Sequence, residues 1–326
     1  MDRSRRPHSF SRAYSRIQSL QVGLRASHSA VIVLRFPSIS SQAETRCPGN
    51  IAGLRPRIVA GALLVIPVRI NQSGPFEFMV DTGSQLNVID PALAAQLNLK
   101  PQGTVGLVAT AAYSQASVGV LDSLEAGSHL VLKPLVVIQD LGPIQAADPR
   151  IRGVLGENFL AHFDVLIDYS RGLLCLDDAK LMEKYIRGER IPLVTSKHPG
   201  TDLPFSERLV VSVNLSDTGT RPILLQVDSG SDGPILYAGN KELEQPLLKR
   251  AKLQGPEVSD ARRAFALLPP QDMRVGSRIV RKVPFVTPAS GSQNIPDREE
   301  DGILATVLFQ RVYVSHSDRF VVFDPR

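Results

Sequence analysis

Short apolar stretches separated by turn-forming residues recur along the chain from residue 58 onward. Mostly apolar residues at 65–70 and 76–80 flank a segment of asparagine, glutamine, serine, glycine and proline at 71–75, a pattern that predicts a β-hairpin. Residues 210–215 and 223–227 flank residues 216–222 in the same way. Stretches of this length, with 24 glycines and 24 prolines in the chain, favour a mostly β protein.

The second hairpin repeats the first one, together with the residues that follow it. Val65 and Val210 are 145 residues apart, and the acids that follow the second strand of each hairpin, Asp81 and Asp228, are 147 residues apart. A third block, beginning at residue 153, returns near residue 302 with an offset of 149. Offsets that grow by short insertions in loops are typical of a duplicated unit. The chain is therefore predicted to contain two similar lobes.

The pattern of capping residues, prolines and charges predicts the helices, the connection between the lobes and the lobe boundaries. Residues 91–99 predict a short helix that Asp90 caps, and residues 157–163 predict another. In the second copy of the unit, residues 241–253 are the helical candidate, weakened by Pro246. Residues 178–207, charged and rich in proline, predict the connection between the lobes. The predicted division is a tail or targeting segment at 1–45, an N-terminal lobe at 46–185 and a C-terminal lobe at 186–326.

The positive charge of the chain is concentrated in its first 43 residues. Of the net charge of +5, this segment contributes +6, from seven arginines and one acid, so the remainder carries −1. A near-neutral body has no basic face for phosphates, which argues against a nucleic-acid partner. The apolar run at residues 30–34 is shorter than the ~7–15 residues of a signal-peptide core. A targeting segment, a disordered tail and a misplaced start remain open, with a periplasmic or secreted location favoured over a cytoplasmic one.

The chain lacks the motifs of disulfide-rich, zinc-dependent, serine-nucleophile and nucleotide-binding proteins. The two cysteines, Cys47 and Cys175, are too few for a disulfide framework, and either a disulfide or two buried thiols fits them. The six histidines form no His-Glu-x-x-His motif, and no nucleophile elbow, Walker loop or dinucleotide fingerprint occurs. No metal or organic cofactor is expected. No run of ~18 apolar residues predicts a transmembrane helix.

Two acidic motifs stand at equivalent points of the duplicated unit. Asp81 begins Asp-Thr-Gly and Asp228 begins Asp-Ser-Gly, and each acid directly follows an apolar strand. A carboxylate at the end of a buried strand is costly to desolvate unless it has partners. Two such acids brought together supply partners for each other, so Asp81 and Asp228 are predicted to meet.

These motifs resemble those of the pepsin and retropepsin superfamily of aspartic peptidases, especially the bacterial retropepsin-like proteins with two concatenated lobes. The resemblance extends over residues 58–325 and is sharpest at the acidic loops and at residues 154–156. It implies two acid protease β-barrel lobes related by a pseudo-twofold axis, with a few short helices, and Asp81 and Asp228 as the catalytic pair. The loop residues that it implies as supports are Thr82, Gly83, Ser84, Ser229, Gly230 and Ser231.

Each supporting residue has an implied role. Thr82 and Ser229 would hydrogen-bond across the axis to the opposite loop. Glycines 83 and 230 would let backbone amides approach the carboxylates, and serines 84 and 231 would orient each carboxylate through their hydroxyls. Residues 103–117, with Tyr113, lie where the resemblance would place a substrate-covering flap, and a plain surface hairpin is the alternative.

The resemblance implies an aspartic endopeptidase that hydrolyses a peptide or unfolded protein through a water held by the two carboxyls. Because both acids lie in one chain, a monomer with intramolecular pairing of the lobes is expected. The second copy departs from the family's apolar-apolar-glycine segment at Ala305. This departure, with Gln85 and Asp232 just beyond the motifs, raises an alternative, a catalytically weak or inactive peptide-binding protein.

Overall fold

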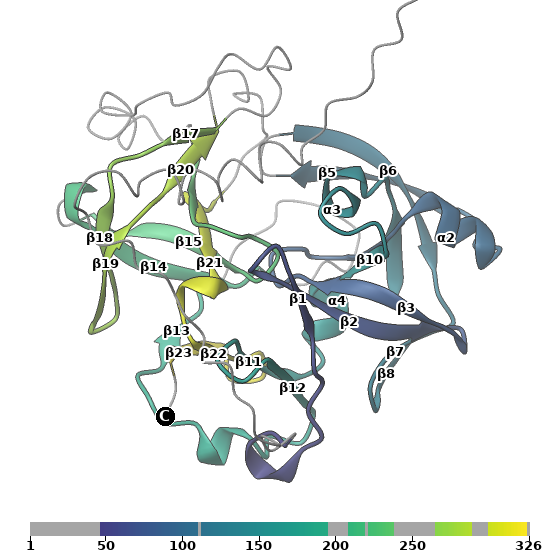
Figure 1. Ribbon diagram of the computed structural model, residues 1–326, viewed down its shortest axis with the longest axis horizontal. Coiled ribbons are helices and arrows are strands. Elements are labelled where there is room, and N and C mark those ends of the chain that lie inside the picture. The colour runs from purple at the N-terminus through teal and green to yellow at the C-terminus, as the bar shows by residue number, and fades with distance from the viewer. Residues whose placement is uncertain are drawn as a thin grey trace, which may run out of the picture.

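The computed structural model describes residues 46–109, 112–194, 208–218, 221–237, 265–288 and 299–324 (Figure 1). Within these ranges the chain is mostly β with a few short helices, which confirms the predicted fold class. The strands form a ten-stranded sheet, an eight-stranded sheet and a five-stranded sheet. No helix of the described part of the chain is long and apolar enough to cross a membrane. The predicted tail and the helical candidate at 241–253 lie outside the described residues.

The first copy of the duplicated unit spans residues 57–177 and the second spans residues 210–323. The first copy contains β1 (Arg57–Val59), β2 (Leu63–Ile70), β3 (Ser73–Val80), β4 (Asn87–Ile89), α2 (Pro91–Gln96), β5 (Gly103–Ala109), β6 (Ala112–Val120), β7 (Ser123–Ala126), β8 (His129–Leu132), β9 (Leu135–Ile138), α3 (Gly142–Gln145), β10 (Ile151–Leu155), α4 (Glu157–Leu160), β11 (Asp164–Asp168) and β12 (Leu173–Asp177). The second contains β14 (Val210–Leu215), η4 (Ser216–Thr218), β15 (Ile223–Asp228), β16 (Ile235–Leu236), β17 (Phe265–Leu267), β18 (Gln271–Val275), β19 (Arg278–Val283), β20 (Val286–Pro288), β21 (Gly302–Ala305), η6 (Thr306–Leu308), β22 (Arg311–Ser315) and β23 (Phe320–Phe323).

The two large sheets share one strand order. Strands β6-β9-β4-β10-β3-β2-β7-β8 of the first sheet correspond to β17-β20-β16-β21-β15-β14-β18-β19 of the second. The directions agree as well, because β10 runs parallel to β3 and antiparallel to β4, and β21 runs parallel to β15 and antiparallel to β16. The sheets lie on opposite sides of the molecule in Figure 1. The predicted duplication is therefore confirmed at the level of topology.

The first hairpin is tighter than the sequence pattern predicts. Strand β3 starts at Ser73, which pairs with Ile70, so the turn contains two residues rather than the predicted five. Both turn residues, Asn71 and Gln72, have positive φ values of 48° and 65°. Two residues of positive φ match the twist of adjacent antiparallel strands and favour a two-residue turn. The prediction of a turn over residues 71–75 was wrong for this reason.

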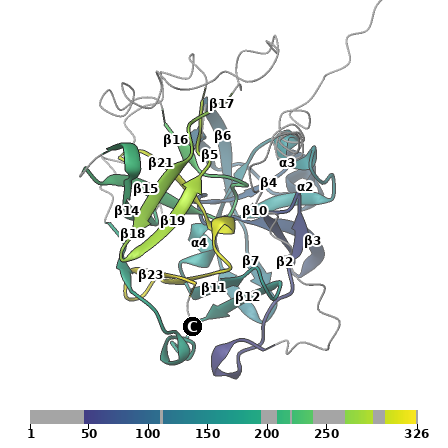
Figure 2. The ribbon, with the colours of Figure 1, turned by 60° about the vertical axis from the view of Figure 1, so that its left-hand side comes forward.

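The five-stranded sheet joins the two copies. Its order is β12-β11-β22-β23-β13, and it lies below the two large sheets in Figures 1 and 2. In the antiparallel pairing of β11 with β22, Leu166 lies opposite Tyr313, 147 residues away. The positive-φ turn residues that follow these two strands, Gly172 and Arg319, are also 147 residues apart, so Leu166 and Tyr313 are equivalent and the pseudo-twofold axis passes through this pair.

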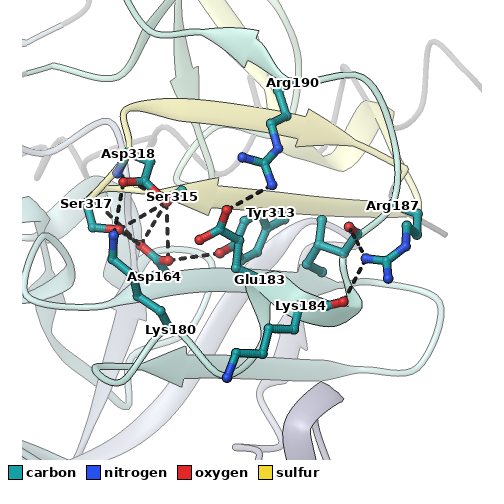
Figure 3. Close-up of polar contacts among 11 residues, drawn as sticks. Asp164, Lys180, Glu183, Lys184, Arg187, Arg190, Tyr313, Ser315, Ser317 and Asp318 are labelled. Atoms are coloured by element: carbon teal, nitrogen blue, oxygen red, sulfur yellow. Dashed lines mark hydrogen bonds and ion pairs between the residues drawn. The ribbon is translucent and has the colours of Figure 1, made fainter.

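A buried carboxylate ties the same two strands together. Asp164 of β11 is 3% exposed, and it accepts hydrogen bonds from the Tyr313 hydroxyl at 2.9 Å and the Ser315 hydroxyl at 3.2 Å (Figure 3). Ser317 donates a further hydroxyl bond at 3.3 Å. A buried carboxylate needs such donors to offset its lost hydration. The two copies are thus joined by both backbone pairing and a satisfied polar group.

The described part of the predicted connection, residues 178–194, is more structured than its charge and prolines predict. It contains η3 (Glu183–Tyr185) and β13 (Ile191–Pro192), and β13 pairs with β23 at the edge of the five-stranded sheet. The buried side chains of Ile191 and Leu193 explain why this segment packs instead of remaining a free linker. The lobe boundary at 185/186 stays a prediction.

Three local predictions can be compared directly with the structure. Helix α2 begins at Pro91, and Asp90 caps it by accepting a 2.8 Å bond from the Leu93 amide, as predicted. Helix α4 begins at Glu157 but ends at residue 160, earlier than predicted, and α3 was not predicted. Cys47 and Cys175, whose state the sequence left open, form a disulfide that ties the described N-terminal segment to β12.

Candidate active site

The two acidic loops begin where the central strands of the large sheets end. Asp81 directly follows β3 and Asp228 is the last residue of β15. The neighbouring parallel strands hold both positions, since the Asp81 amide donates to the Leu155 carbonyl at 3.0 Å and Asp228 lies in register with Ala305. Apolar strands therefore deliver both carboxyls to the interface between the copies.

The structure brings the two carboxyls into contact, and their side chains hydrogen-bond to each other. Each carboxyl also lies against the glycine of the opposite loop. A Cβ added to Gly83 would lie 2.4 Å from Asp228 Oδ2, and one added to Gly230 would lie 2.4 Å from Asp81 Cγ. Real Cβ atoms do not approach so closely. The carboxyl of each loop, which with its loop forms one half-site, therefore fits only because the opposite loop has a glycine at this position.

The hydroxyls of Thr82 and Ser229 hold the loops together. The Thr82 hydroxyl donates to the Val227 carbonyl at 3.0 Å and accepts from the Ser229 amide at 3.0 Å. The Ser229 hydroxyl makes the matching pair of bonds, to the Val80 carbonyl at 3.0 Å and from the Thr82 amide at 3.1 Å. Both side chains are fully buried, so these four bonds are shielded from water. This reciprocal arrangement is the cross-axis bonding that the sequence resemblance implied.

Backbone amides, rather than serine hydroxyls, contact the carboxylates. Asp81 Oδ1 accepts from the Gly83 amide at 2.8 Å and the Ser84 amide at 3.2 Å. The Ser84 hydroxyl donates instead to the Leu86 carbonyl at 2.8 Å. This hydroxyl was expected to orient the carboxylate, but it bonds the backbone of its own loop instead.

The second loop follows the same rule. Asp228 Oδ1 accepts from the Gly230 amide at 2.6 Å. The Ser231 hydroxyl donates to the Gly233 carbonyl at 2.7 Å, while the Ser231 amide contributes a hydrogen bond to Asp228. Equivalent atoms in the two loops thus make equivalent bonds, although the loop sequences differ.

The environment of the pair favours a bound proton. Burial raises the pKa of Asp81, although the Gly83 amide lowers it, and the net shift is upward. Burial also raises the pKa of Asp228, the negative charge of Asp81 raises it further, and the result lies well above the usual carboxyl value. Two acids in contact cannot both ionise readily, so the pair retains one proton to a higher pH than a free carboxyl would.

The segments beneath the two loops differ in packing. Gly156 has no space for a side chain, because an added Cβ would lie 2.4 Å from the Leu86 carbonyl oxygen. Ala305 occupies the equivalent position of the second copy and is fully buried, and β21 still pairs with β15 up to this residue. The second copy therefore accommodates the alanine methyl group.

Sequence reasoning missed one polar side chain that links the loops. Gln226 of β15 is 6% exposed and donates its side-chain amide to the Gly83 carbonyl at 2.9 Å. Its signal was a single polar residue within an otherwise apolar strand. Such a residue is costly to bury without a partner, but the sequence does not show that the partner lies 143 residues away.

The proposed flap region forms a hairpin. Strands β5 and β6 pair antiparallel over residues 103–118, and residues 110 and 111 lie outside the described part. The structure does not describe the side chain of Tyr113, so its role as a flap residue stays a prediction. The described residues contain no group of histidine, cysteine and acidic side chains arranged to hold a metal ion.

The comparisons with known proteins find a likeness to aspartic proteases in the first copy. Residues 66–159, which include the first acidic loop and Gly156, match a family model described as aspartyl protease. This match supports the resemblance to the retropepsin-like aspartic peptidase superfamily and an aspartic protease-like function, which implies peptide substrates.

A solved retropepsin-like aspartic protease from Rickettsia conorii is similar to part of this chain. It is 20% identical, and the alignment covers 35% of this chain and 81% of that one with a TM-score of 0.26. A comparison with curated proteins finds no significant match.

Proposed function

We propose that this protein is an aspartic endopeptidase in which Asp81 and Asp228 together activate a water molecule. The observation that carries the proposal is the reciprocal packing of each carboxyl against the glycine of the opposite loop. This packing brings Asp228, which is buried, and Asp81, which is partly exposed, into hydrogen-bonding contact in one chain. Such a contact raises proton affinity and costs stability, a combination that is common at catalytic sites.

The chemistry follows from the shared proton. The ionised carboxylate takes a proton from the bridging water as the water oxygen bonds to the peptide carbonyl carbon. The protonated carboxyl donates its proton to the carbonyl oxygen, and a tetrahedral intermediate forms without a covalent bond to the enzyme. Protonation of the peptide nitrogen then allows the carbon–nitrogen bond to break. Each carboxyl alternates between acid and base, and the mechanism requires no cofactor.

The accommodation of Ala305 supports catalysis over peptide binding alone. A weak or inactive protein would be expected if the alanine methyl group displaced the second loop. The Asp228 loop instead retains all the cross-axis bonds of Thr82 and Ser229. The two half-sites therefore have matching polar geometry despite the different residue beneath them.

Hydrolysis of an unfolded protein by the full chain, measured from pH 3 to 8 with and without pepstatin, tests the proposal. Asp81→Asn and Asp228→Asn should each reduce the rate by at least about 1,000-fold, because the water needs one acid and one base. Both variants should keep the wild-type circular dichroism spectrum, since asparagine is nearly isosteric. Substantial hydrolysis by either variant would refute the shared pair, and peptide binding without hydrolysis by the wild type would favour the binding alternative.

We further propose that the enzyme works as a monomer, because one chain supplies both acidic loops. Specific activity should then be independent of protein concentration. A mixture of Asp81→Asn chains with Asp228→Asn chains should have no more activity than either variant alone, since each molecule retains its own defective half-site. Recovery of appreciable activity in the mixture would show that half-sites pair between chains.

A further inference from the structure

A second pair of cross-axis contacts lies just beyond Gly156 and Ala305. Glu157 Oε2 lies 2.8 Å from His316 Nε2, and the Thr306 hydroxyl lies 2.7 Å from the Tyr169 hydroxyl. Tyr169 and His316 occupy equivalent positions of the two copies, 147 residues apart, and Glu157 and Thr306 each directly follow the segment beneath a loop. The pseudo-twofold axis therefore relates the two contacts, yet one is ionisable and the other is neutral.

The bonds of His316 show how the ionisable contact holds its proton. Nδ1 of His316 lies 2.6 Å from the Phe163 carbonyl oxygen. A carbonyl oxygen can only accept, so Nδ1 carries a hydrogen. Nε2 then either donates to an ionised Glu157 or accepts from a protonated one. In both states the pair shares one proton and is neutral overall, and loss of that proton would leave a carboxylate facing a nitrogen lone pair.

Glu157 is connected to the first acidic loop. Its backbone amide donates to the Ser84 carbonyl at 2.8 Å, while the Ser84 amide donates to Asp81. The Glu157 side chain is 1% exposed, and its Oε1 has no hydrogen-bond partner among the described residues. Burial is the main cause of the raised pKa of Asp81, and the negative charge of Glu157 adds to it. The equivalent Thr306 carries no charge.

The surroundings of His316 contain a second acid. Burial lowers the pKa of His316, but the charge of Glu157 and its hydrogen bond outweigh burial, and the net pKa is raised. Asp164 of β11 also raises it, while its carboxylate accepts a hydrogen bond from Tyr313. Nearby histidines 129 and 162 pack against the ring of Phe163. Glu157 is therefore the hydrogen-bonded acidic partner of His316 in the described residues.

We propose that Glu157 and His316 are positioning residues for the acid pair, an inference that rests on the proposed function. Their contact braces the Asp81 loop across the axis. In its ion-pair state the negative end belongs to Glu157, whose backbone bonds that loop, and this end favours the shared proton of the acid pair. Tyr169 and Thr306 make the equivalent cross-axis contact of the second copy without charge. The two acids, equivalent in their backbone bonds, are thus placed in unequal electrostatic surroundings.

Titration of the acid pair with ¹³C-labelled aspartate, followed by NMR, tests the proposal without requiring activity. Glu157→Gln removes a carboxylate that adds to the effect of burial on the pKa of Asp81, and it leaves the more distant His316 uncharged. The midpoint at which the pair loses its proton should therefore fall by about 0.5 pH unit. The alkaline limb of kcat should move by the same amount with little change in KM. Tyr169→Phe, the matched change at the neutral contact, should leave both midpoints in place.

The double variant Glu157→Thr/His316→Tyr is a control for misfolding of the single variant, because it reproduces the neutral contact of the second half-site. It should fold and should show the same lowered midpoint as Glu157→Gln. An unchanged midpoint in both variants, or an equal shift in Tyr169→Phe, would overturn the proposal. If the wild type hydrolyses no peptide but the midpoint still shifts, the proposed function fails and the electrostatic role of the pair stands.

Discussion

The first and second half-sites make the same bonds at the carboxylates and different ones beneath them. Around Asp81 and Asp228 the hydroxyl and amide contacts match atom for atom. One layer below, glycine is replaced by alanine and an ion pair by a neutral contact. Atoms that touch the reacting groups tolerate small displacements only, whereas deeper positions vary if volume and hydrogen bonds are conserved.

Apart from changes to the two acids themselves, substitution of the loop glycines should have the largest effect on activity. In Gly83→Ala the new Cβ would collide with the Asp228 carboxylate, and in Gly230→Ala with that of Asp81. Each variant should lose at least about 100-fold in kcat/KM, because a displacement of about 1 Å misaligns the pair. Gly233→Ala, where a Cβ meets open space, is the matched control. If only one loop glycine proved essential, the half-sites would not be equivalent at the carboxylates.

The disulfide distinguishes the first copy from the second. Cys47 and Cys175 are 128 residues apart in sequence, and a bridge over so long a segment restricts the unfolded chain. Replacing both with serine should lower the free energy of unfolding by about 4 kcal/mol, as measured by urea denaturation. The kcat should be unaffected, because the bridge lies in the five-stranded sheet region. A variant of unchanged stability would show that the bridge contributes little.

Exchange of the residues beneath the loops tests the packing difference. Gly156→Ala should destabilise the protein by about 3 kcal/mol, because its Cβ would overlap the Leu86 carbonyl. Ala305→Gly should cost about 1 kcal/mol, through the flexibility of glycine in the unfolded chain. Thermal unfolding of the two variants measures the difference. Equal costs would mean that the second copy does not provide extra space for the alanine.

Removal of the cross-axis hydroxyls should cost less stability than the Gly156→Ala change. Thr82→Ala and Ser229→Ala each leave one buried amide and one buried carbonyl unpaired. Each should destabilise the protein by about 2 kcal/mol, measured by thermal unfolding. Thr82→Ser and Ser229→Thr retain the hydroxyl and serve as controls. Losses that differed strongly between the two alanine variants would contradict the symmetry of the bonds.

Local features of the fold could be predicted because the residues that determine them are adjacent in sequence. Asp90 beside Pro91 predicts a capped helix, and the structure contains it. Where two local signals competed, the prediction was less accurate. Gly74 and Pro75 suggested a long turn, but the positive φ of Asn71 and Gln72 produced a shorter one.

Contacts between distant residues could not be predicted in this way. Gln226 was visible as a polar residue in an apolar strand, but its partner Gly83 was not. The pairing of Glu157 with His316 spans 159 residues, and neither residue has an unusual local context. The disulfide spans 128 residues, and two cysteines alone fit either a bridge or free thiols.

By itself the sequence determined the repeated order of strands, the placement of Asp81 and Asp228 at equivalent strand ends, and the expectation that the two acids meet. These follow from apolar periodicity and from the cost of burying a lone carboxylate. The tertiary structure decided which atoms contact those acids and which charges lie beneath them. Such contacts depend on the relative placement of the two copies, and the packing of the whole chain, rather than any local pattern, sets that placement.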